Sequence, residues 1–241
     1  MTAILAIGDV HGNARALRAA MAQALGGPCD QIVFMGDLLT YGHDVEAVLE
    51  LVREAQDKYD AALLIGNHDQ LYFDLAQGKR EYLDGLPGWI QDSVTLTARK
   101  FDPATLRSRL SWCEEWTDGS ALFAHANPFG FGDFTYLNDD ADIEAARSAL
   151  ERRGATLGVF GHTHRARWVP GPIVVANAGS VGQPRDRTAQ SVLLRIQIDR
   201  PSTTGTIEPI HYDMQGHLDQ LLRSGLPEDT IVRLCSYFKP F

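Results

Sequence analysis

The sequence is poor in cysteine: it has only three, at positions 29, 113 and 235, and no Cys-x-x-Cys pair. An odd number of widely spaced cysteines excludes a disulfide framework and is typical of a reducing compartment. The chain also lacks any apolar run near the ~18 residues that a membrane-spanning helix needs. Its first residues lack the basic start of a secretory signal. We therefore expect a cytoplasmic protein with no membrane association.

Positive charge is the scarcer sign, with 22 lysines and arginines against 31 aspartates and glutamates and a net charge of −9. This acidic balance is spread along the chain and repels other polyanions, which excludes a stable complex with nucleic acid. A local cation such as a bound metal could still attract an anionic substrate. No repeat, low-complexity tract or linker is evident, so the length predicts a single domain over residues 1–241. The oligomeric state is left open.

Short apolar runs of strand length recur along the chain. They cover residues 3–7, 31–35, 61–65, 121–124, 156–160 and 173–176. Helical patterns follow the early runs, and Asn13 and Asp44 are suitable N-terminal caps for two of these helices. Strands that alternate with helices predict an α/β-type arrangement with crossover connections.

Two later regions depart from this alternation. Residues 70–117 carry three of the four tryptophans and are expected to form a helical insertion beside the sheet. Residues 191–198 and 206–212 alternate like the strands of a hairpin, with a turn between them. A helix is expected over 140–153, and the segment 216–238 is expected to form two helices.

Polar side chains with metal-binding capacity follow the first five apolar runs. These clusters are Asp9-Val10-His11, Gly36-Asp37, Asn67-His68-Asp69, His125-Ala126-Asn127 and His162-Thr163-His164. The carboxyl ends of parallel strands converge on one edge of a sheet, so the clusters are expected to meet there. Carboxylates, imidazoles and an amide oxygen without thiolate indicate a hard-to-intermediate metal. Their number exceeds what one tetrahedral ion needs and suits two ions about 3.5–4 Å apart that share a carboxylate.

Each cluster alone also has an ordinary structural explanation. Asp-x-His occurs in capped or salt-bridged turns, and Asn-His-Asp is common in turns because Asn and Asp tolerate such backbone conformations. Five clusters after five strands, in one order, are difficult to explain by turns alone. The combination therefore predicts a metal site.

In this order, the motifs Asp-x-His, Gly-Asp, Gly-Asn-His-Asp, a lone His after a strand and Gly-His-Thr-His resemble the signature of the calcineurin-like metallophosphoesterase superfamily. The similarity extends into residues 177–186, a loop similar to that of small bacterial phosphodiesterases and diadenosine-tetraphosphatase-like phosphatases. The resemblance implies an α+β fold: a two-sheet β-sandwich flanked by helices, with four layers in the order α/β/β/α. It also implies a two-metal site at one edge.

The resemblance assigns roles to the residues that match its motifs. One divalent ion is expected to take Asp9, His11 and His164 and the other Asn67, His125 and His162, with Asp37 bridging them. Manganese, iron, zinc and nickel all accept such ligands. The implied reaction is hydrolysis of a phosphomonoester or phosphodiester by hydroxide that the ions activate. His68, with Asp69 beside it, is expected to be catalytic and to protonate the leaving group.

The chain departs from the pattern of serine/threonine-type protein phosphatases. Their Gly-Asp motif continues into Asp-Arg-Gly, whereas this chain has Thr40, Tyr41 and Gly42. Tyrosine cannot replace a bidentate guanidinium, which disfavours that activity. Arg185, Asn127 and Tyr41 are the candidates for substrate contacts, although ordinary surface, turn and packing roles remain open for them.

Several alternatives remain for the function. The expected partner is a phosphorylated small molecule or nucleotide, and a dinucleoside polyphosphate fits the same core because the loops, not the metals, read the rest of the substrate. A non-catalytic binding scaffold on the same fold is disfavoured because every ligand position is filled. A dinuclear amide hydrolase is disfavoured as well. The barrel-shaped enzymes of that class also place His-x-His after a strand, but they need a later lysine in a pattern that this sequence does not show.

Overall fold

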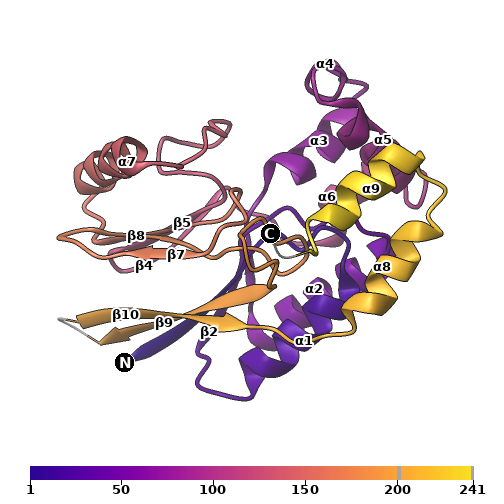
Figure 1. Cartoon of the computed structure of the whole chain (residues 1–241). Helices are drawn as coiled ribbons and strands as arrows, with labels where there is room; N and C mark the ends of the chain where they lie inside the picture. The colour runs from indigo at the N-terminus through magenta and orange to yellow at the C-terminus, as the bar shows by residue number, and fades with distance from the viewer. Residues whose placement is uncertain (200–201, 240–241) are drawn as a thin grey trace.

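The computed structural model describes residues 1–199 and 202–239, which form two five-stranded sheets that pack face to face (Figure 1). The first sheet has the order β10-β9-β1-β2-β3 and the second the order β4-β5-β6-β8-β7. The first sheet contains β1 (Thr2–Ile7), β2 (Gln31–Phe34), β3 (Ala62–Leu63), β9 (Val192–Asp199) and β10 (Ser202–Pro209). The second contains β4 (Glu115–Asp118), β5 (Ala121–Ala124), β6 (Leu157–Phe160), β7 (Arg167–Val169) and β8 (Val174–Asn177).

Strand β1 explains why its sequence is an unbroken apolar run. Ile4 and Ala6 point into the core between the sheets, where they join Phe123 of the second sheet. Leu5 and Ile7 point to the other face and pack beneath the helices. Because both faces of β1 are buried, the run carries no polar alternation. The parallel pairing of β1 with β2 then brings the ends of both strands to one edge.

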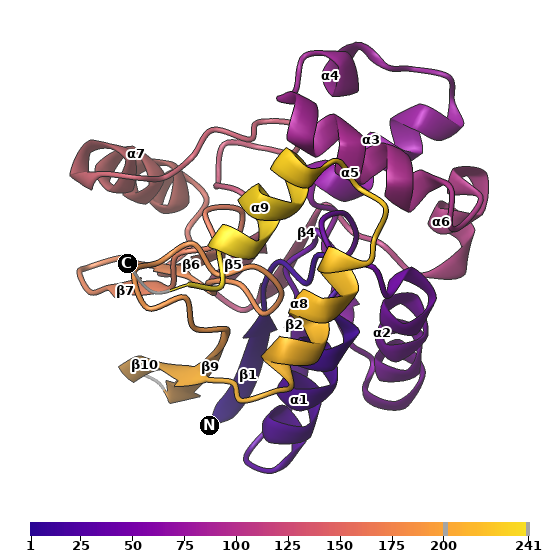
Figure 2. The same ribbon diagram turned by 45° about the vertical axis from the view of Figure 1, so that its right-hand side comes forward.

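Helices cover the outer faces of both sheets (Figures 1 and 2). They are α1 (Ala14–Leu25), α2 (Val45–Tyr59), α3 (Asn67–Ala76), α4 (Glu81–Asp84), α5 (Gly88–Ala98), α6 (Pro103–Arg109), α7 (Asp140–Arg152), α8 (Met214–Leu222) and α9 (Glu228–Ser236). Helix α7 lies over the second sheet, and α1 and α2 lie over the first (Figure 1). As predicted, the Asn13 side chain caps α1 by accepting from the Ala16 backbone N–H. The expected four-layer α+β sandwich is confirmed.

Three details of the predicted elements are wrong. Helices α3 to α6 end at Arg109, and the chain then enters the second sheet as β4, which begins inside the expected insertion and pairs with β5 beyond it. Strand β7 was not expected either. Both strands are short and half-buried, so neither shows the apolar run of a central strand. Strand β10 begins at Ser202 rather than at 206, and part of the predicted turn lies outside the described residues.

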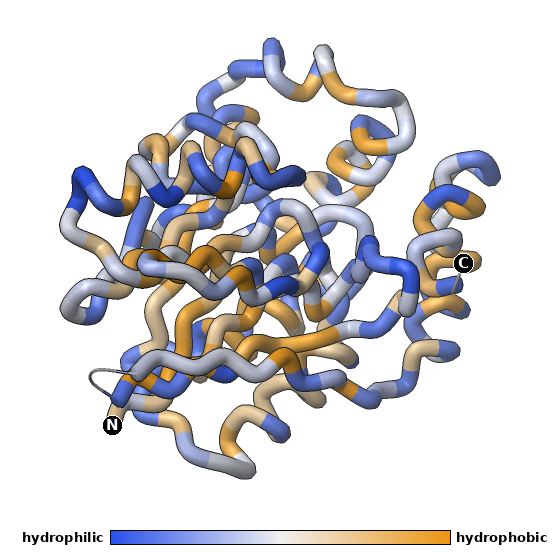
Figure 3. Tube along the Cα trace, turned by 60° about the vertical axis from the view of Figure 1, so that its left-hand side comes forward, coloured by the Kyte–Doolittle hydropathy of each residue, from blue (hydrophilic) through white to orange (hydrophobic). Residues whose placement is uncertain are grey.

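Hydrophobic residues follow the strands and the inner faces of the helices (Figure 3). Within residues 1–199 and 202–239, no helix combines the length and the hydropathy needed to cross a membrane. The elements that matter for the site are therefore the strand ends at one edge of the sandwich and the helices beside that edge.

Candidate functional site

The five predicted clusters meet at the carboxyl-end edge of the two sheets. Loops after β1, β2 and β3 of one sheet face loops after β5 and β6 of the other. The side chains that the structure brings together there are Asp9, His11, Asp37, Asn67, His125, His162 and His164, and each is at most 5% exposed. Burying so many polar groups in one place is costly unless they share hydrogen bonds or a cation.

Asp37 lies between two groups of donors. Asp9, His11, Asp37 and His164 offer atoms that all lie within 4.8 Å of one another, and so do Asp37, His125 and His162. The Asp37 Oδ2 atom is 3.7 Å from His11 Nε2 and 3.6 Å from His125 Nε2. It is therefore the carboxylate that the two groups share.

Hydrogen bonds to backbone carbonyls orient three of the imidazoles. The Nδ1 atoms of His11, His125 and His164 lie 3.0, 2.6 and 2.6 Å from the carbonyl oxygens of Leu39, Met35 and Gln183. A carbonyl only accepts, so Nδ1 donates and the Nε2 atom of each neutral ring carries a lone pair. Such second contacts fix metal-ligating histidines in many proteins.

The free lone pairs point at one another. His11 Nε2 and His164 Nε2 are 3.0 Å apart, and His125 Nε2 is 3.1 Å from the Asn67 side-chain oxygen. Acceptors at these distances repel unless a cation lies between them. The Asn67 amide nitrogen donates to the Tyr82 hydroxyl at 3.2 Å, which turns the amide oxygen toward the cluster.

His162 is held in the opposite tautomer. Its Nε2 donates to the Phe134 carbonyl oxygen at 2.9 Å, so Nδ1 is the nitrogen with the lone pair. The ring of Tyr136 stacks on the imidazole with centroids 4.2 Å apart. The loop that carries Phe134 and Tyr136 therefore covers this ligand.

Burial dominates the electrostatics of the cluster. It raises the pKa of Asp9 to about 6 and, together with the nearby Asp9 charge, the pKa of Asp37 well above its ordinary value. It also lowers the pKa values of His11, His162 and His164 well below the usual range, which keeps these rings in the neutral, metal-binding form. Two buried carboxylates among neutral imidazoles form a donor set that fits divalent cations.

The backbone of the ligand loops is unusual. Positive φ angles occur at five residues of the cluster: Asp9 (43°), His11 (47°), Asp37 (52°), His162 (66°) and His164 (58°). This left-handed conformation costs roughly 1–2 kcal/mol at each residue with a Cβ. Gly66 shows how tight the loops are, because a Cβ there would overlap the Asp37 carboxylate.

His68 lies beside the cluster without joining either donor group. Its Nε2 is 3.1 Å from the Tyr41 hydroxyl, and its Nδ1 is buried with no hydrogen-bond partner among the described residues. Its backbone N–H donates to Asp37 Oδ1 at 2.8 Å, which fixes α3 against the cluster. Burial, followed by the charge of Arg185, lowers the pKa of His68 well below its usual value.

Asp69, expected beside His68 in catalysis, points elsewhere. Its carboxylate accepts from the backbone N–H groups of Asp37 (2.6 Å), Leu38 (3.0 Å) and Gly66 (2.9 Å). Burial raises its pKa to about 7. The contacts of Asp69 thus hold the ligand loops and do not reach His68.

The cluster opens into a cavity of about 410 Å³. Two of the three candidates for substrate contacts, Tyr41 and Arg185, line it. Asn127 does not: its amide nitrogen donates to the Asp133 side chain at 2.9 Å and to the Thr135 carbonyl at 3.0 Å, so it shapes the loop before α7. The Arg185 guanidinium group, which lines this cavity, therefore comes from the loop after β8 and not from the loop after Asp37.

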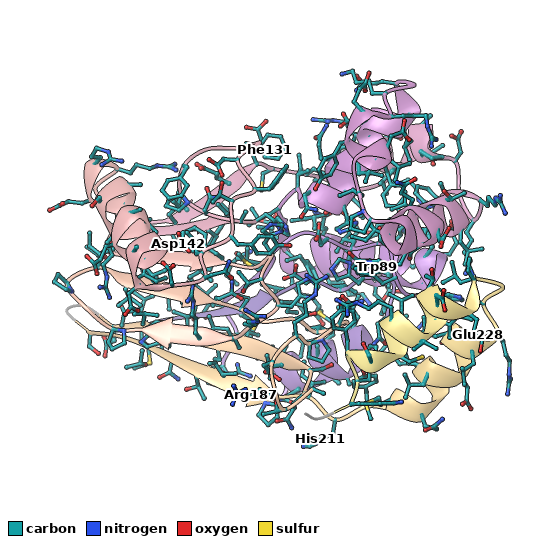
Figure 4. All side chains as sticks on the ribbon, turned by 45° about the horizontal axis from the view of Figure 1, so that its top comes forward. Trp89, Phe131, Asp142, Arg187, His211 and Glu228 are labelled. Carbon is teal, nitrogen blue, oxygen red and sulfur yellow. The ribbon has the colours of Figure 1, made fainter. Side chains whose placement is uncertain are left out.

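Sequence reasoning missed the residues on the far wall of this cavity. Trp89, Arg233 and Tyr237 line it, and no motif marks any of them. Trp89, one of the three tryptophans of the expected insertion, is only half-buried. In Figure 4, Trp89 lies among the helices at the right of the view, whereas Phe131 lies at the top, toward the helix that carries Asp142. A larger cavity of about 780 Å³ lies at the opposite ends of the strands, near Thr2 and Asp118, far from these groups.

Comparisons with known proteins show similar folds and a related sequence. An uncharacterized protein of Methanocaldococcus jannaschii is 24% identical in an alignment of 247 positions. The alignment covers 93% of this chain and 94% of that protein. The fold is similar to that of a metallophosphoesterase from Sphaerobacter thermophilus, with a TM-score of 0.74, 23% identity and coverage of 98% and 99% of the two chains. It is also similar to that of a hypothetical protein from Pyrococcus horikoshii OT3, with a TM-score of 0.81, 17% identity and coverage of 97% and 98%.

The family itself follows from the sequence match. The profile described as "Calcineurin-like phosphoesterase superfamily domain" matches residues 2–199, a range that contains the whole His/Asp cluster. With its two-sheet sandwich and a buried donor set at the strand ends, the chain belongs to the calcineurin-like phosphoesterase superfamily.

Proposed function

We propose that the protein is a divalent-metal-dependent phosphoesterase that hydrolyses phosphomonoesters or phosphodiesters. One observation carries the proposal: the Asp37 carboxylate lies between two groups of buried nitrogen and oxygen donors, next to a cavity that also contains His68 and Arg185. This arrangement supplies both a place for cations and a place for an anionic substrate.

Two divalent ions are the cofactors in this proposal. Asp9, His11 and His164 hold one ion, Asn67, His125 and His162 hold the other, and Asp37 is their shared ligand. When bound, such ions lower the pKa of water toward neutrality and offset the negative charge of the reacting phosphate. The buried, mutually repelling donors support this assignment.

His68 is the proton donor in this proposal. In its protonated form the ring carries a hydrogen on each nitrogen; Nε2 lies 3.1 Å from the Tyr41 hydroxyl oxygen, and Nδ1 has no hydrogen-bond partner among the described residues. Burial favours the neutral ring, and the negative charge of a bound phosphate favours the protonated one. The Tyr41 hydroxyl orients the His68 ring in this proposal, and its buried phenol keeps its proton because burial raises its pKa.

Arg185 is the phosphate-binding residue of the chain in this proposal. Its guanidinium lies over the Tyr41 ring at 6.0 Å and lines the cavity next to His68. Guanidinium groups bind phosphate oxygens in a bidentate manner. Asp69 acts through the loops, because its three backbone contacts position Asp37 and the start of α3.

Reconstitution of the purified chain tests the proposal. Protein stripped with a chelator is loaded with manganese, iron(II), zinc or nickel, and metal content is measured before assay. We expect two ions per chain and turnover of 4-nitrophenyl phosphate or bis(4-nitrophenyl) phosphate with at least one metal; diadenosine tetraphosphate is included as a third substrate. Full metal binding without turnover of any of these esters would instead favour a binding scaffold.

A further inference from the structure

The C-terminal helices supply one wall of the candidate active site. Helix α9 packs against α5 and α8, and in Figure 2 it lies across the side of the molecule where the strand-end loops meet. From α9 and the residue after it, Arg233 and Tyr237 line the same cavity as His68. This segment lies beyond residues 2–199, so the family match says nothing about it.

Aromatic rings hold two guanidinium groups in this cavity. The Tyr237 ring contacts both, with Arg185 Cζ at 5.4 Å and Arg233 Cζ at 5.2 Å from its centroid. Arg233 also lies 5.7 Å from the Trp89 centroid. Trp89 in turn stacks on Tyr41, with centroids 5.3 Å apart and planes 22° from parallel. Cation–π contacts of this kind favour one placement of a flexible arginine side chain.

Both guanidinium groups lack an acidic partner in the part of the chain that the structure describes. Neither Arg185 nor Arg233 forms an ion pair within residues 1–199 and 202–239, although the chain carries a net charge of −9. Arg109 and Arg195, by contrast, bind Glu46 and Glu208. The Arg185 side chain donates to the Gln183 amide oxygen at 3.0 and 3.3 Å. Two like charges in one cavity repel unless an anion lies between them.

The two arginines occupy different depths. Arg185 is half-buried beside Tyr41 and His68, whereas Arg233 is exposed at the rim. A cavity of about 410 Å³ falls in the ~300–1,000 Å³ range of small-molecule sites, so it has room for more than one phosphoryl group. The inner guanidinium is placed for the group that reacts, and the outer one for a group further along the substrate.

We infer that Arg233 binds a second phosphate group of the substrate, so that this chain selects compounds with two or more linked phosphates, such as nucleoside diphosphates or dinucleoside polyphosphates, over simple monoesters. The inference rests on the proposed phosphoesterase function. The competing explanation is that Arg233 only fastens α9 to Trp89 and Tyr237. A fastening role affects all ligands alike, whereas a binding role affects only those with the second phosphate.

Equilibrium binding to the manganese-loaded full chain distinguishes the two explanations. The probes are methylphosphonate and methylenebisphosphonate, which carry one and two phosphonate groups and resist hydrolysis. Calorimetry is run with equal free manganese in both solutions, and competitive inhibition of 4-nitrophenyl phosphate turnover gives a second measure. We expect the bisphosphonate to bind at least about tenfold more tightly, the size of one charge-assisted contact.

Variants then locate the source of that preference. Arg233→Gln is expected to reduce bisphosphonate affinity about tenfold and to leave methylphosphonate affinity unchanged, and Arg233→Lys to keep part of the preference. Arg223→Gln removes the same charge from an exposed position just after α8, outside the cavity, and is the matched control. The thermal midpoint of each variant reports whether α9 stays in place.

Two results would overturn the inference: an equal loss for both probes in Arg233→Gln, or an equal loss of the preference in Arg223→Gln. Its failure differs from failure of the proposed function. Turnover of 4-nitrophenyl phosphate without an Arg233-dependent preference contradicts the inference alone. Arg233-dependent binding without turnover of any ester contradicts the proposed function alone.

Discussion

The floor and the wall of the pocket are built differently. The floor consists of buried side chains on strand-end loops, and five of its residues have left-handed backbone. Its residues are Asp9, His11, Asp37, Asn67, His68, His125, His162 and His164. The wall consists of Trp89 on α5, Arg233 on α9 and Tyr237, which lie on or next to regular helices and are half-buried or exposed. In the proposed function, the loops with left-handed backbone hold the groups that do chemistry, and the regular helices hold the groups that select the substrate.

Additional hydrogen bonds stabilise the backbone of the floor loops. Asp69 ties three backbone N–H groups, the Ser180 hydroxyl donates to the Asp9 carbonyl at 2.8 Å, and the Asn177 amide donates to the Gly161 carbonyl at 2.5 Å. These bonds offset the cost of left-handed backbone and of buried carboxylates. Four predictions test this division, from the largest expected effect to the smallest.

Asp37→Asn is expected to have the largest effect, because Asp37 is the one carboxylate shared by both donor groups. The amide keeps the shape but removes the charge that holds the cations. We expect turnover to fall by about 10³ or more, with loss of at least one bound ion per chain. Metal analysis and kcat on 4-nitrophenyl phosphate measure both effects. Retention of both ions with full activity would break the assignment of the floor.

His68→Gln separates proton transfer from metal binding within the floor. His68 belongs to neither donor group, so metal content is expected to stay unchanged. Loss of a general acid should reduce kcat by about 10²-fold on esters with poor leaving groups and by less on nitrophenyl esters. A plot of rate against leaving-group pKa gives the difference. A variant that loses an ion would show that His68 is a ligand instead.

The pH dependence of stability tests how α8, which packs beside α9 of the wall, is held in place by His217. This residue of α8 is 3% exposed, its ring lies 5.2 Å from Phe238, and burial, followed by the charges of His43 and Arg15, lowers its pKa to about 4. The unfolded chain takes up the proton near pH 6.5 and the folded chain does not, so this contribution to stability is complete above pH 6.5 and is lost as the pH falls toward 4.

Between pH 7 and pH 5 the wild type should therefore lose about 2 kcal/mol more unfolding free energy than His217→Gln does. Urea unfolding of the two proteins at both pH values measures this difference. Equal losses in the two proteins would show that His217 is not buried as a neutral ring.

Tyr41→Phe acts where the floor meets the wall and should have the smallest effect. The substitution removes the hydroxyl next to His68 Nε2 and keeps the ring that stacks on Trp89. We expect kcat to fall about tenfold with KM nearly unchanged, because only the orientation of His68 is affected. Steady-state kinetics over a range of pH provide the measurement, and a change confined to KM would assign Tyr41 to substrate binding instead.

Much of the floor could be predicted from the sequence, and little of the wall. Asp9, His11 and Asp37 follow apolar runs of strand length. Because the carboxyl ends of parallel strands converge at one edge of a sheet, the sequence predicts that these three side chains lie close together. Trp89 and Arg233 are 144 positions apart along the printed sequence and share no motif, so their contact depends on how α9 packs against α5. Asn127 is the opposite case. Its place in a motif made it a candidate for a substrate contact, but its side chain donates to the Thr135 carbonyl in the loop before α7.

The sequence by itself determined the family, the alternation of strands and helices, and the set of residues able to bind metal, because these depend on side-chain chemistry and on periods of two to four residues. Only the tertiary structure decided that the Asp69 carboxylate accepts from three backbone N–H groups, and that two guanidinium groups with no ion pair among the described residues line one cavity. Those features arise from packing between distant segments, and local sequence carries no record of which distant side chain fills a given space.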